Sequence, residues 1–210
     1  MVWRAGGAGH PFPGARWLAL AWLAVYLPAY SQAYGWVNFL FLCNLGVILT
    51  VAGIWRGSSL LISSQAVAAM PVCLAWWLDA GGRLLLGRHP LGVTAYMWDP
   101  CYPLFTRLLS LYHVAWPIVL VWCLRRVGYD RRGYPAQGAF AVVVLLVSCL
   151  TDPALNVNFA FAAPLFKRSL GPAPVHLALT ALALVGVMYG ATHLALAALL
   201  PRRSPGRPAG

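Results

Sequence analysis

The last apolar run of the chain, residues 175–200, contains no Asp, Glu, Lys or Arg. A helix needs about 20 apolar residues to cross the hydrocarbon core of a bilayer, so this run is long enough to span it. Five earlier runs approach that length, at residues 17–34, 36–55, 59–78, 104–124 and 136–150. The sequence therefore predicts an all-α fold, a polytopic integral membrane helical bundle with about six transmembrane helices.

Charged side chains are too few to cover a soluble protein of this size. They make up 9% of the 210 residues, against 61% hydrophobic residues, whereas a soluble domain is about 25% charged. Lipid must then be the exterior solvent. One apolar stretch, Leu84 to Leu86, lies between Arg83 and Arg88 and is too short to cross, so we expect an interfacial or re-entrant segment within residues 81–103.

The ends of the chain differ in composition from its middle. Residues 1–16 are rich in Gly and Pro and predict a disordered basic tail, residues 17–200 a transmembrane helical domain, and residues 201–210 a second disordered basic tail. The sequence Ser31-Gln32-Ala33 resembles a signal-peptidase site. Two alternatives follow, a retained first helix and a cleaved signal peptide, and we favour retention.

The net charge of +11 first suggests a nucleic-acid partner. The cations, however, flank the apolar runs and form no single basic face, which argues against nucleic acid and for membrane lipids as the partners. Cytoplasmic loops carry the excess of Arg and Lys, and this rule predicts a multi-pass protein of the cell (inner) membrane with both termini in the cytoplasm. The oligomeric state stays open. The predicted cytoplasmic set is Arg4, Arg16, Arg56, Arg125, Arg126, Arg131, Arg132, Arg202, Arg203 and Arg207, against Arg83, Arg88, Arg107, Lys167 and Arg168 outside.

A polar side chain inside a membrane is costly, so His113 is the first candidate for chemistry. Pro117 lacks the N–H that would bond the carbonyl of His113. This predicts a bend and a free acceptor beside the imidazole, a way to open a cavity in a packed bundle. The alternative is a histidine that only packs, hydrogen-bonded to a neighbouring helix.

Cys43 is the second candidate, because Asn38 and Asn44 accompany it. At about 1.5 Å rise per residue, Cys43 and His113 lie at similar depths, roughly 10 and 14 Å from the outer ends of their helices. Alone, a buried cysteine is usually a small apolar filler. We assign that role to the cysteines at 73, 123 and 149.

Three further polar residues lie on the predicted outer side. Asn158 could orient the histidine or bind a lipid ester, whereas for Asn156 we favour the turn and capping chemistry that often accompanies Asx-Pro sequences such as Asp152-Pro153. Arg107 could pair with a lipid phosphate, with interface anchoring as its alternative.

Metal and cofactor motifs are sparse. The five histidines include no pair spaced three or four apart, which argues against a diiron enzyme. A b-type haem held by His113 and His176 is geometrically possible. The sequence has no phosphate loop, dinucleotide fingerprint or nucleophile elbow, and its five cysteines show no paired spacing. We therefore predict no metal, no cofactor and no disulfide framework.

Four short motifs occur along the chain: WVNFLFLCN at 36–44, LSLYH at 109–113, GYDRR at 128–132 and NVNF at 156–159. Their order resembles an uncharacterised family of bacterial polytopic membrane-associated proteins. More distantly it is similar to the androgen-induced protein family, six-helix intramembrane threonine hydrolases that act on fatty-acid esters of hydroxy fatty acids. It is also similar to related membrane acyltransferases that use a cysteine.

In those families a nucleophile on an early helix works with a histidine that is followed four residues later by proline. His113 and Pro117 match this pattern. An ungapped comparison places Phe41 at the threonine position of the hydrolases, whereas the cysteine-using relatives align with Cys43. The resemblance thus implies a cysteine enzyme more than a threonine enzyme.

Our leading hypothesis is an intramembrane lipid ester hydrolase or acyltransferase. It uses Cys43 as nucleophile and His113 as base, with Asn158 or Asn44 as orienting or oxyanion groups. Arg107 and Asn38 are candidates for substrate binding. The alternative is a non-catalytic multi-pass membrane protein, either a scaffold or assembly subunit or a small-solute carrier.

Overall fold

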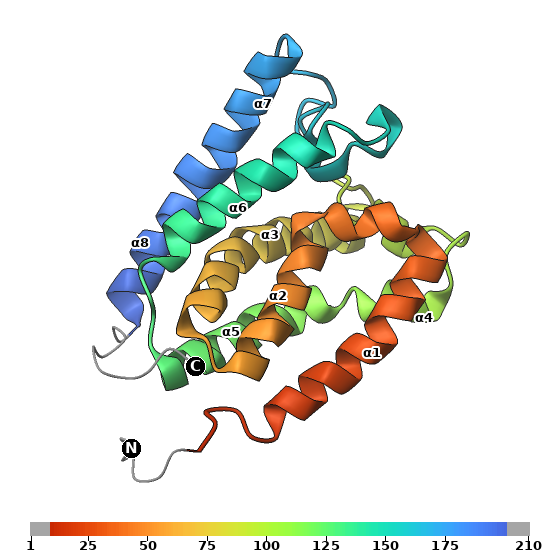
Figure 1. Ribbon diagram of the computed structural model, residues 1–210. Helices are drawn as coiled ribbons and strands as arrows, with labels where there is room; N and C mark the ends of the chain where they lie inside the picture. The colour runs from red at the N-terminus through yellow and green to blue at the C-terminus, as the bar shows by residue number, and fades with distance from the viewer. Residues whose placement is uncertain (1–8, 201–210) are drawn as a thin grey trace.

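The computed structural model describes residues 9–200. The regular elements of this part of the chain are all helices, and β-type pairing occurs only as isolated bridges, such as that between Ala163 and Arg168. The predicted all-α fold class is confirmed. In chain order (Figure 1) the elements are α1 (Ala15–Tyr34), the 3-10 helix η1 (Trp36–Leu40), α2 (Leu42–Arg56), α3 (Ser59–Leu86), η2 (Ala95–Trp98), α4 (Leu104–Leu109), α5 (Tyr112–Val127), α6 (Gly133–Ser148), η3 (Pro153–Leu155), η4 (Val157–Phe159), α7 (Ala173–Ala181), the π-helix η5 (Leu182–Tyr189) and α8 (Gly190–Leu199).

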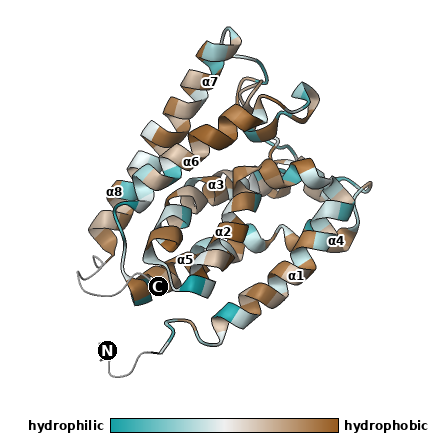
Figure 2. Cartoon of the chain, viewed as in Figure 1, coloured by the Kyte–Doolittle hydropathy of each residue, from teal (hydrophilic) through white to brown (hydrophobic). Residues whose placement is uncertain are grey.

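Three helical stretches are long and apolar enough to cross a membrane: Ser59–Leu86, Leu104–Val127 and Ala173–Leu199. Two further apolar helices, α2 and α6, are shorter, with 15 and 16 residues. Hydrophobic residues dominate the long helices, whereas hydrophilic residues gather near the loops (Figure 2). These features support a membrane protein.

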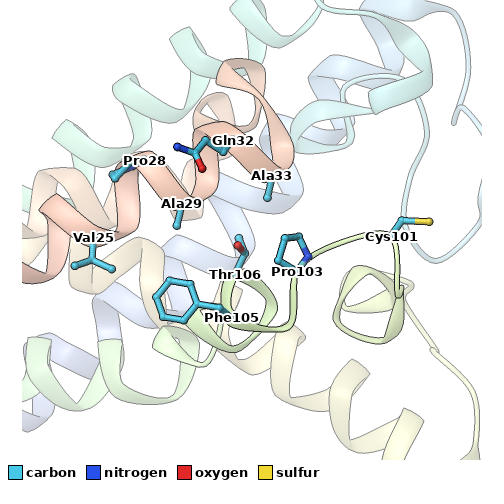
Figure 3. Close-up of a pocket in the computed structure, with 9 residues that line it drawn as sticks. All are labelled: Val25, Pro28, Ala29, Gln32, Ala33, Cys101, Pro103, Phe105 and Thr106. Atoms are coloured by element: carbon cyan, nitrogen blue, oxygen red, sulfur yellow. The ribbon is translucent and has the colours of Figure 1, made fainter.

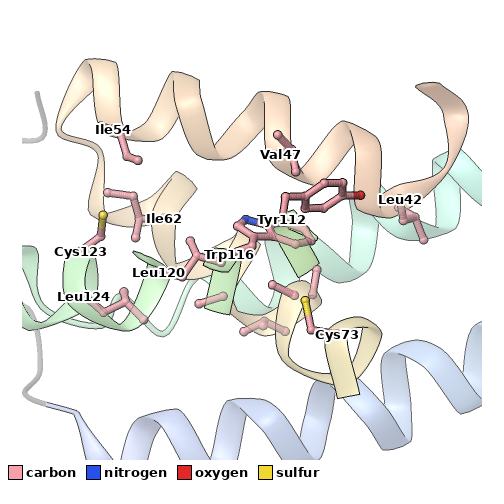
Figure 4. Packing of buried hydrophobic residues seen from close by; sticks show 14 of the residues in the cluster. Leu42, Val47, Ile54, Ile62, Cys73, Tyr112, Trp116, Leu120, Cys123 and Leu124 are labelled. Carbon is pink, nitrogen blue, oxygen red and sulfur yellow. The ribbon is translucent and has the colours of Figure 1, made fainter. Parts of the chain in front are cut away.

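Helix α3 is the centre of the bundle and packs against α2, α5, α6 and α8. Its middle is rich in alanine, and Ala66 and Ala69 are fully buried, because small side chains let neighbouring helices approach closely. Larger side chains such as Ile62 and Leu120 fill the space between the helices (Figure 4). A chain with few charges thus still builds a dense apolar core.

Helix α3 is longer than predicted. Leu84 to Leu86 form its last turn and are no separate interfacial segment, so the predicted boundary at Leu78 was wrong. The helix ends where Gly87 adopts a left-handed conformation (φ 69°), a common C-terminal cap. The fully buried Asp79 then accepts hydrogen bonds from the backbone N–H groups of residues 91, 92 and 94, which folds the next loop back onto the helix.

The other helix boundaries differ from the predicted ones because the backbone is interrupted locally. The extended backbone of Phe41 (ψ 131°) separates η1 from α2, and Ser110 and Leu111 separate α4 from α5. The last predicted helix contains η5, whose wider turns coincide with the placement of Tyr189 in the core. An apolar pattern alone reveals none of these breaks.

The N-terminal segment was predicted as a disordered tail over residues 1–16. Residues 1–8 lie outside the described residues, but the part from residue 9 packs onto the bundle. Phe12 is fully buried and its ring lies 5.5 Å from that of Trp122. The His10 Nε2 donates to the carbonyl of Trp55 at 2.9 Å. The predicted C-terminal tail, residues 201–210, also lies outside the described part.

Candidate functional site

A buried asparagine on α2 is the centre of a polar cluster. The Asn44 Oδ1 accepts hydrogen bonds from the hydroxyls of Tyr26 (2.7 Å) and Tyr112 (3.1 Å), and its Nδ2 donates to the carbonyl of Asn38 (2.7 Å). Buried polar groups need such partners. The cluster joins α1, η1, α2 and α5, and Asn38 contributes its backbone rather than its side chain.

Cys43 lies beside this cluster in the first turn of α2. Its thiol donates to the Asn44 Oδ1, with the two atoms 3.7 Å apart. The Tyr112 hydroxyl and the backbone of Cys43 and Asn44 also lie near the sulfur, although that hydroxyl donates to the Asn44 Oδ1 and the Asn44 N–H to the carbonyl of Phe41. Burial of the thiol disfavours its charged form, and the neighbouring groups at the helix N-terminus offset this only in part.

The His113 imidazole lies between two aromatic rings. Trp76 stacks on it at 5.3 Å with planes 6° apart, and Tyr112 stacks on it at 4.1 Å with planes 24° apart. The Nδ1 atom is 2.9 Å from the carbonyl of Ser110. A carbonyl can only accept, so Nδ1 carries the proton and the neutral ring keeps the Nε2 lone pair. Within residues 9–200, Nε2 has no hydrogen-bond partner.

The effect predicted for Pro117 is visible in one respect. The carbonyl of His113 lacks its helical donor and instead accepts a hydrogen bond from the Trp77 Nε1 at 3.1 Å. The break in the helix, however, lies about one turn before His113, at Ser110 and Leu111. The carbonyl released by Pro117 thus ties α5 to α3.

Cys43 and His113 share a neighbour but do not bond each other. No hydrogen bond joins the two side chains in the described part of the chain. Tyr112 touches both, through its hydroxyl at Cys43 and its ring at His113. Tyr112 is therefore a shared neighbour of the two predicted residues.

The tyrosines of α1 were missed at the level of sequence. Tyr26, Tyr30 and Tyr34 follow one another every four residues, a spacing that puts them on one helix face. The hydroxyl of Tyr30 is 2.5 Å from the Ser110 Oγ, next to the carbonyl that holds His113. This polar stripe in an apolar helix was the available signal.

Asn158 supports the site from a distance. Its Oδ1 accepts from the backbone N–H of Leu42 (2.8 Å), and its Nδ2 donates to the Leu40 carbonyl (2.8 Å) and the Ser148 Oγ (2.9 Å). With these partners it fixes the start of α2, and hence Cys43. Asn156 bonds only its own loop, as the turn interpretation predicted.

Both nitrogens of the buried His176 are used within the protein. Its Nδ1 accepts from the backbone N–H of Leu170 (3.2 Å), and its Nε2 donates to the carbonyl of Phe159 (3.0 Å). The arrangement leaves no His176 lone pair for a haem iron. Across residues 9–200, no group of three or more His, Cys, Asp or Glu side chains could hold a metal ion.

Comparisons of the chain with protein-family models, curated proteins and solved structures gave no match. The family resemblance drawn from the four motifs stays a prediction. The functional argument therefore depends on the geometry of the Cys43, Asn44, Tyr112 and His113 cluster.

Proposed function

We propose that this protein is an intramembrane lipid ester hydrolase or acyltransferase with Cys43 as its nucleophile. The observation that carries the proposal is the position of the Cys43 thiol in the first turn of α2, next to the Tyr112 hydroxyl and the N-terminal backbone of the helix. His113, the candidate base, stacks on the same Tyr112 and keeps its Nε2 unprotonated. A cysteine with helix N-terminal donors and an available base is the usual arrangement of an activated thiol.

The reaction would proceed in two acyl transfers. The sulfur attacks the ester carbonyl carbon while its proton passes to the His113 Nε2, and the carbon–sulfur bond forms as the oxyanion develops. Collapse breaks the carbon–oxygen bond, and the imidazolium returns the proton to the leaving alkoxide. Water, or an acceptor hydroxyl, then attacks the thioester, with His113 again as base. The Tyr112 hydroxyl would stabilise the oxyanion once it turns away from the Asn44 Oδ1.

One movement or one bridging water is needed, because Cys43 and His113 make no direct bond. Catalytic contacts are often loose without substrate and tighten in the complex. Tyr112 contacts both side chains, so we take a change in its position as the movement that brings them together. The proposal therefore predicts that Tyr112 matters as much as either partner.

We further propose six membrane spans with both termini in the cytoplasm. The start of α1 and the end of α8 lie at the same end of the bundle (Figure 1), which supports an even number of crossings. The Arg126 guanidinium donates to the carbonyl of Pro11, so basic residues and the N-terminal segment share that end. This fits the excess of arginine expected on the cytoplasmic side.

Acyl-enzyme trapping tests the catalytic proposal. Purified protein would be treated with a long-chain p-nitrophenyl ester, and the adduct located by peptide mass spectrometry. We expect an acyl group on Cys43, loss of it in Cys43→Ala, and slowing by at least about tenfold in His113→Gln, since a general base contributes about 10²–10⁴-fold. Cys149→Ala removes another half-buried thiol and is the matched control. Equal labelling of wild type and His113→Gln would contradict the mechanism.

The non-catalytic alternative is favoured by one observation, the aromatic rings on both faces of His113. Such a ring could simply pack. In that case Cys43 should react no faster than Cys149, and His113→Gln should change only stability. The trapping experiment separates the two functions.

A further inference from the structure

An open groove of about 570 Å³ lies on the side of α1 next to its tyrosine face. One wall is α1, with Val25, Pro28, Ala29 and Gln32, and the other is the start of α4, with Phe105 and Thr106 (Figure 3). This volume falls in the range of ligand pockets, roughly 300–1,000 Å³. Most of the lining is apolar, so the groove suits a hydrocarbon chain.

The wall also carries the hydroxyl of a buried residue, and this hydroxyl makes no hydrogen bond. Thr106 is only 3% exposed, yet its side chain makes no hydrogen bond to any residue from 9 to 200. Its oxygen lies on the side of α4 that faces α1 in Figure 3. The Gln32 amide on the opposite wall is exposed and likewise makes no hydrogen bond in the described chain. Buried polar groups are rarely left unpaired without a reason.

A half-buried cation lies beside the groove. Arg107 follows Thr106, and its Nη1 donates to the carbonyl of Met97 at 3.0 Å, but its buried Nε has no partner. Arg107 forms no salt bridge with the acidic side chains of the described residues. Asp99 of the neighbouring loop accepts a hydrogen bond from the backbone N–H of Cys101, and it lies close enough to Arg107 for an electrostatic interaction.

Tyr34 adds a second unpaired group at the same place. Its hydroxyl is buried without a hydrogen-bond partner, and it lies close enough to Arg107 for an electrostatic interaction. The groove thus has the Thr106 hydroxyl in its wall and the half-buried Arg107 next to that residue, whereas the Tyr34 hydroxyl and the Arg107 Nε are enclosed in the protein. Arginine pairs especially well with phosphate.

We propose that this groove binds one acyl chain of an anionic phospholipid, with the headgroup phosphate held by Arg107 and Thr106. The groove supplies apolar contact for the chain, and the guanidinium and the hydroxyl supply donors for the phosphate. A zwitterionic lipid carries a second, positive charge that Arg107 disfavours. The assignment names the lipid class that the proposed enzyme would recognise and in that sense rests on the proposed function, although binding itself needs no catalysis.

Cys101 provides a reporter for the experiment, because it is exposed and lies at the rim of the groove. The rate of Cys101 modification by a maleimide would be followed by peptide mass spectrometry in detergent micelles. The micelles would contain increasing mole fractions of dioleoyl phosphatidylglycerol or dioleoyl phosphatidylcholine. The Cys43→Ala background removes any acyl transfer. Inorganic phosphate alone tests whether the acyl chain is required.

We expect phosphatidylglycerol to protect Cys101 and phosphatidylcholine or inorganic phosphate to protect it weakly. Arg107→Gln should weaken the protection about tenfold, as expected for losing a hydrogen bond to a charged group. Ala29→Phe, which fills the groove from the other wall, should remove it without touching Arg107. Arg88→Gln, an exposed outer arginine, is the matched control and should leave protection unchanged. Circular dichroism of each variant verifies that it is folded.

Equal protection by the two lipids, or full protection in both Arg107→Gln and Ala29→Phe, would overturn the assignment. Protection by inorganic phosphate as strong as by phosphatidylglycerol would reduce the site to an anion site and also overturn it. Selective protection, combined with a wild-type protein that forms no Cys43 thioester in the trapping experiment, would refute the enzyme proposal and leave the groove proposal intact. Acylation of Cys43 in the wild type without selective protection of Cys101 would refute the groove proposal and leave the enzyme proposal intact.

Discussion

The hydrogen bond from Trp77 to the carbonyl of His113 offers a direct test of how this helix pair is stabilised. Trp77→Phe keeps an aromatic ring but removes the indole donor, leaving the carbonyl that Pro117 frees without its 3.1 Å partner. An unsatisfied acceptor in an apolar setting costs about 1–3 kcal/mol. We expect Trp77→Phe to lower the free energy of unfolding by about 1–2 kcal/mol.

The same reasoning predicts the effect in a second background. In Pro117→Ala the new backbone N–H can donate to the carbonyl of His113, so the Trp77 indole is no longer its sole partner. Trp77→Phe should then cost about 0.5 kcal/mol or less, a coupling of about 1 kcal/mol in the double-mutant cycle. Reversible unfolding in mixed SDS and dodecylmaltoside micelles, followed by far-UV circular dichroism, measures each corner of the cycle.

Trp36→Phe is the control, because this indole is 76% exposed and makes no hydrogen bond in the described chain. It should change stability by less than about 0.5 kcal/mol. If Trp77→Phe destabilises equally with and without Pro117, the carbonyl account is refuted and the loss belongs to the packing of the larger ring.

Three further predictions use the same unfolding assay. Asn158→Leu removes three hydrogen bonds and leaves backbone groups at the start of α2 unpaired, so it should lower the free energy of unfolding by about 2–4 kcal/mol. Asn156→Leu should lower it less, because the bonds of Asn156 are local. An equal loss in the two variants would argue against a role of Asn158 in fixing the start of α2. Gly133→Ala would place a Cβ 2.8 Å from the backbone of α3, so it should lower the free energy of unfolding by about 1–3 kcal/mol. Gly81→Ala has open space around the new Cβ and should raise that free energy by about 0.5–1 kcal/mol. Phe12→Ala empties a fully buried position and should lose about 3–5 kcal/mol; a loss below about 1 kcal/mol would mean that the N-terminal segment does not hold the bundle.

The sequence was sufficient for the helical class and for most helix positions, because long apolar runs have few alternatives. It located His113 and the carbonyl freed by Pro117, since both follow from local chemistry. It could not place Trp77 as the donor to that carbonyl, because their contact joins two helices. Residues 81–86 were misassigned because glycines and flanking arginines look like a boundary, whereas the helix continues to its glycine cap.

At the candidate site, too, the sequence revealed individual polar residues but not the contacts between helices. Cys43, Asn44 and His113 were named from their polarity in apolar surroundings, and they do gather around Tyr112. The roles expected of Asn158 and Asn38 were different, since one caps a helix and the other offers only its carbonyl. Tyr26 and Tyr30 reach the cluster from a helix whose partners no local pattern specifies.

The position of those two tyrosines bears on how the protein is made in the cell. Tyr26 and Tyr30 donate or share hydrogen bonds with Asn44 and Ser110, and α1 also forms one wall of the groove. Processing after Ala33 would remove all of these groups at once. The mature polypeptide should therefore keep its first helix as a permanent part of the fold, and a signal peptidase that cut there would produce a substrate for membrane quality control.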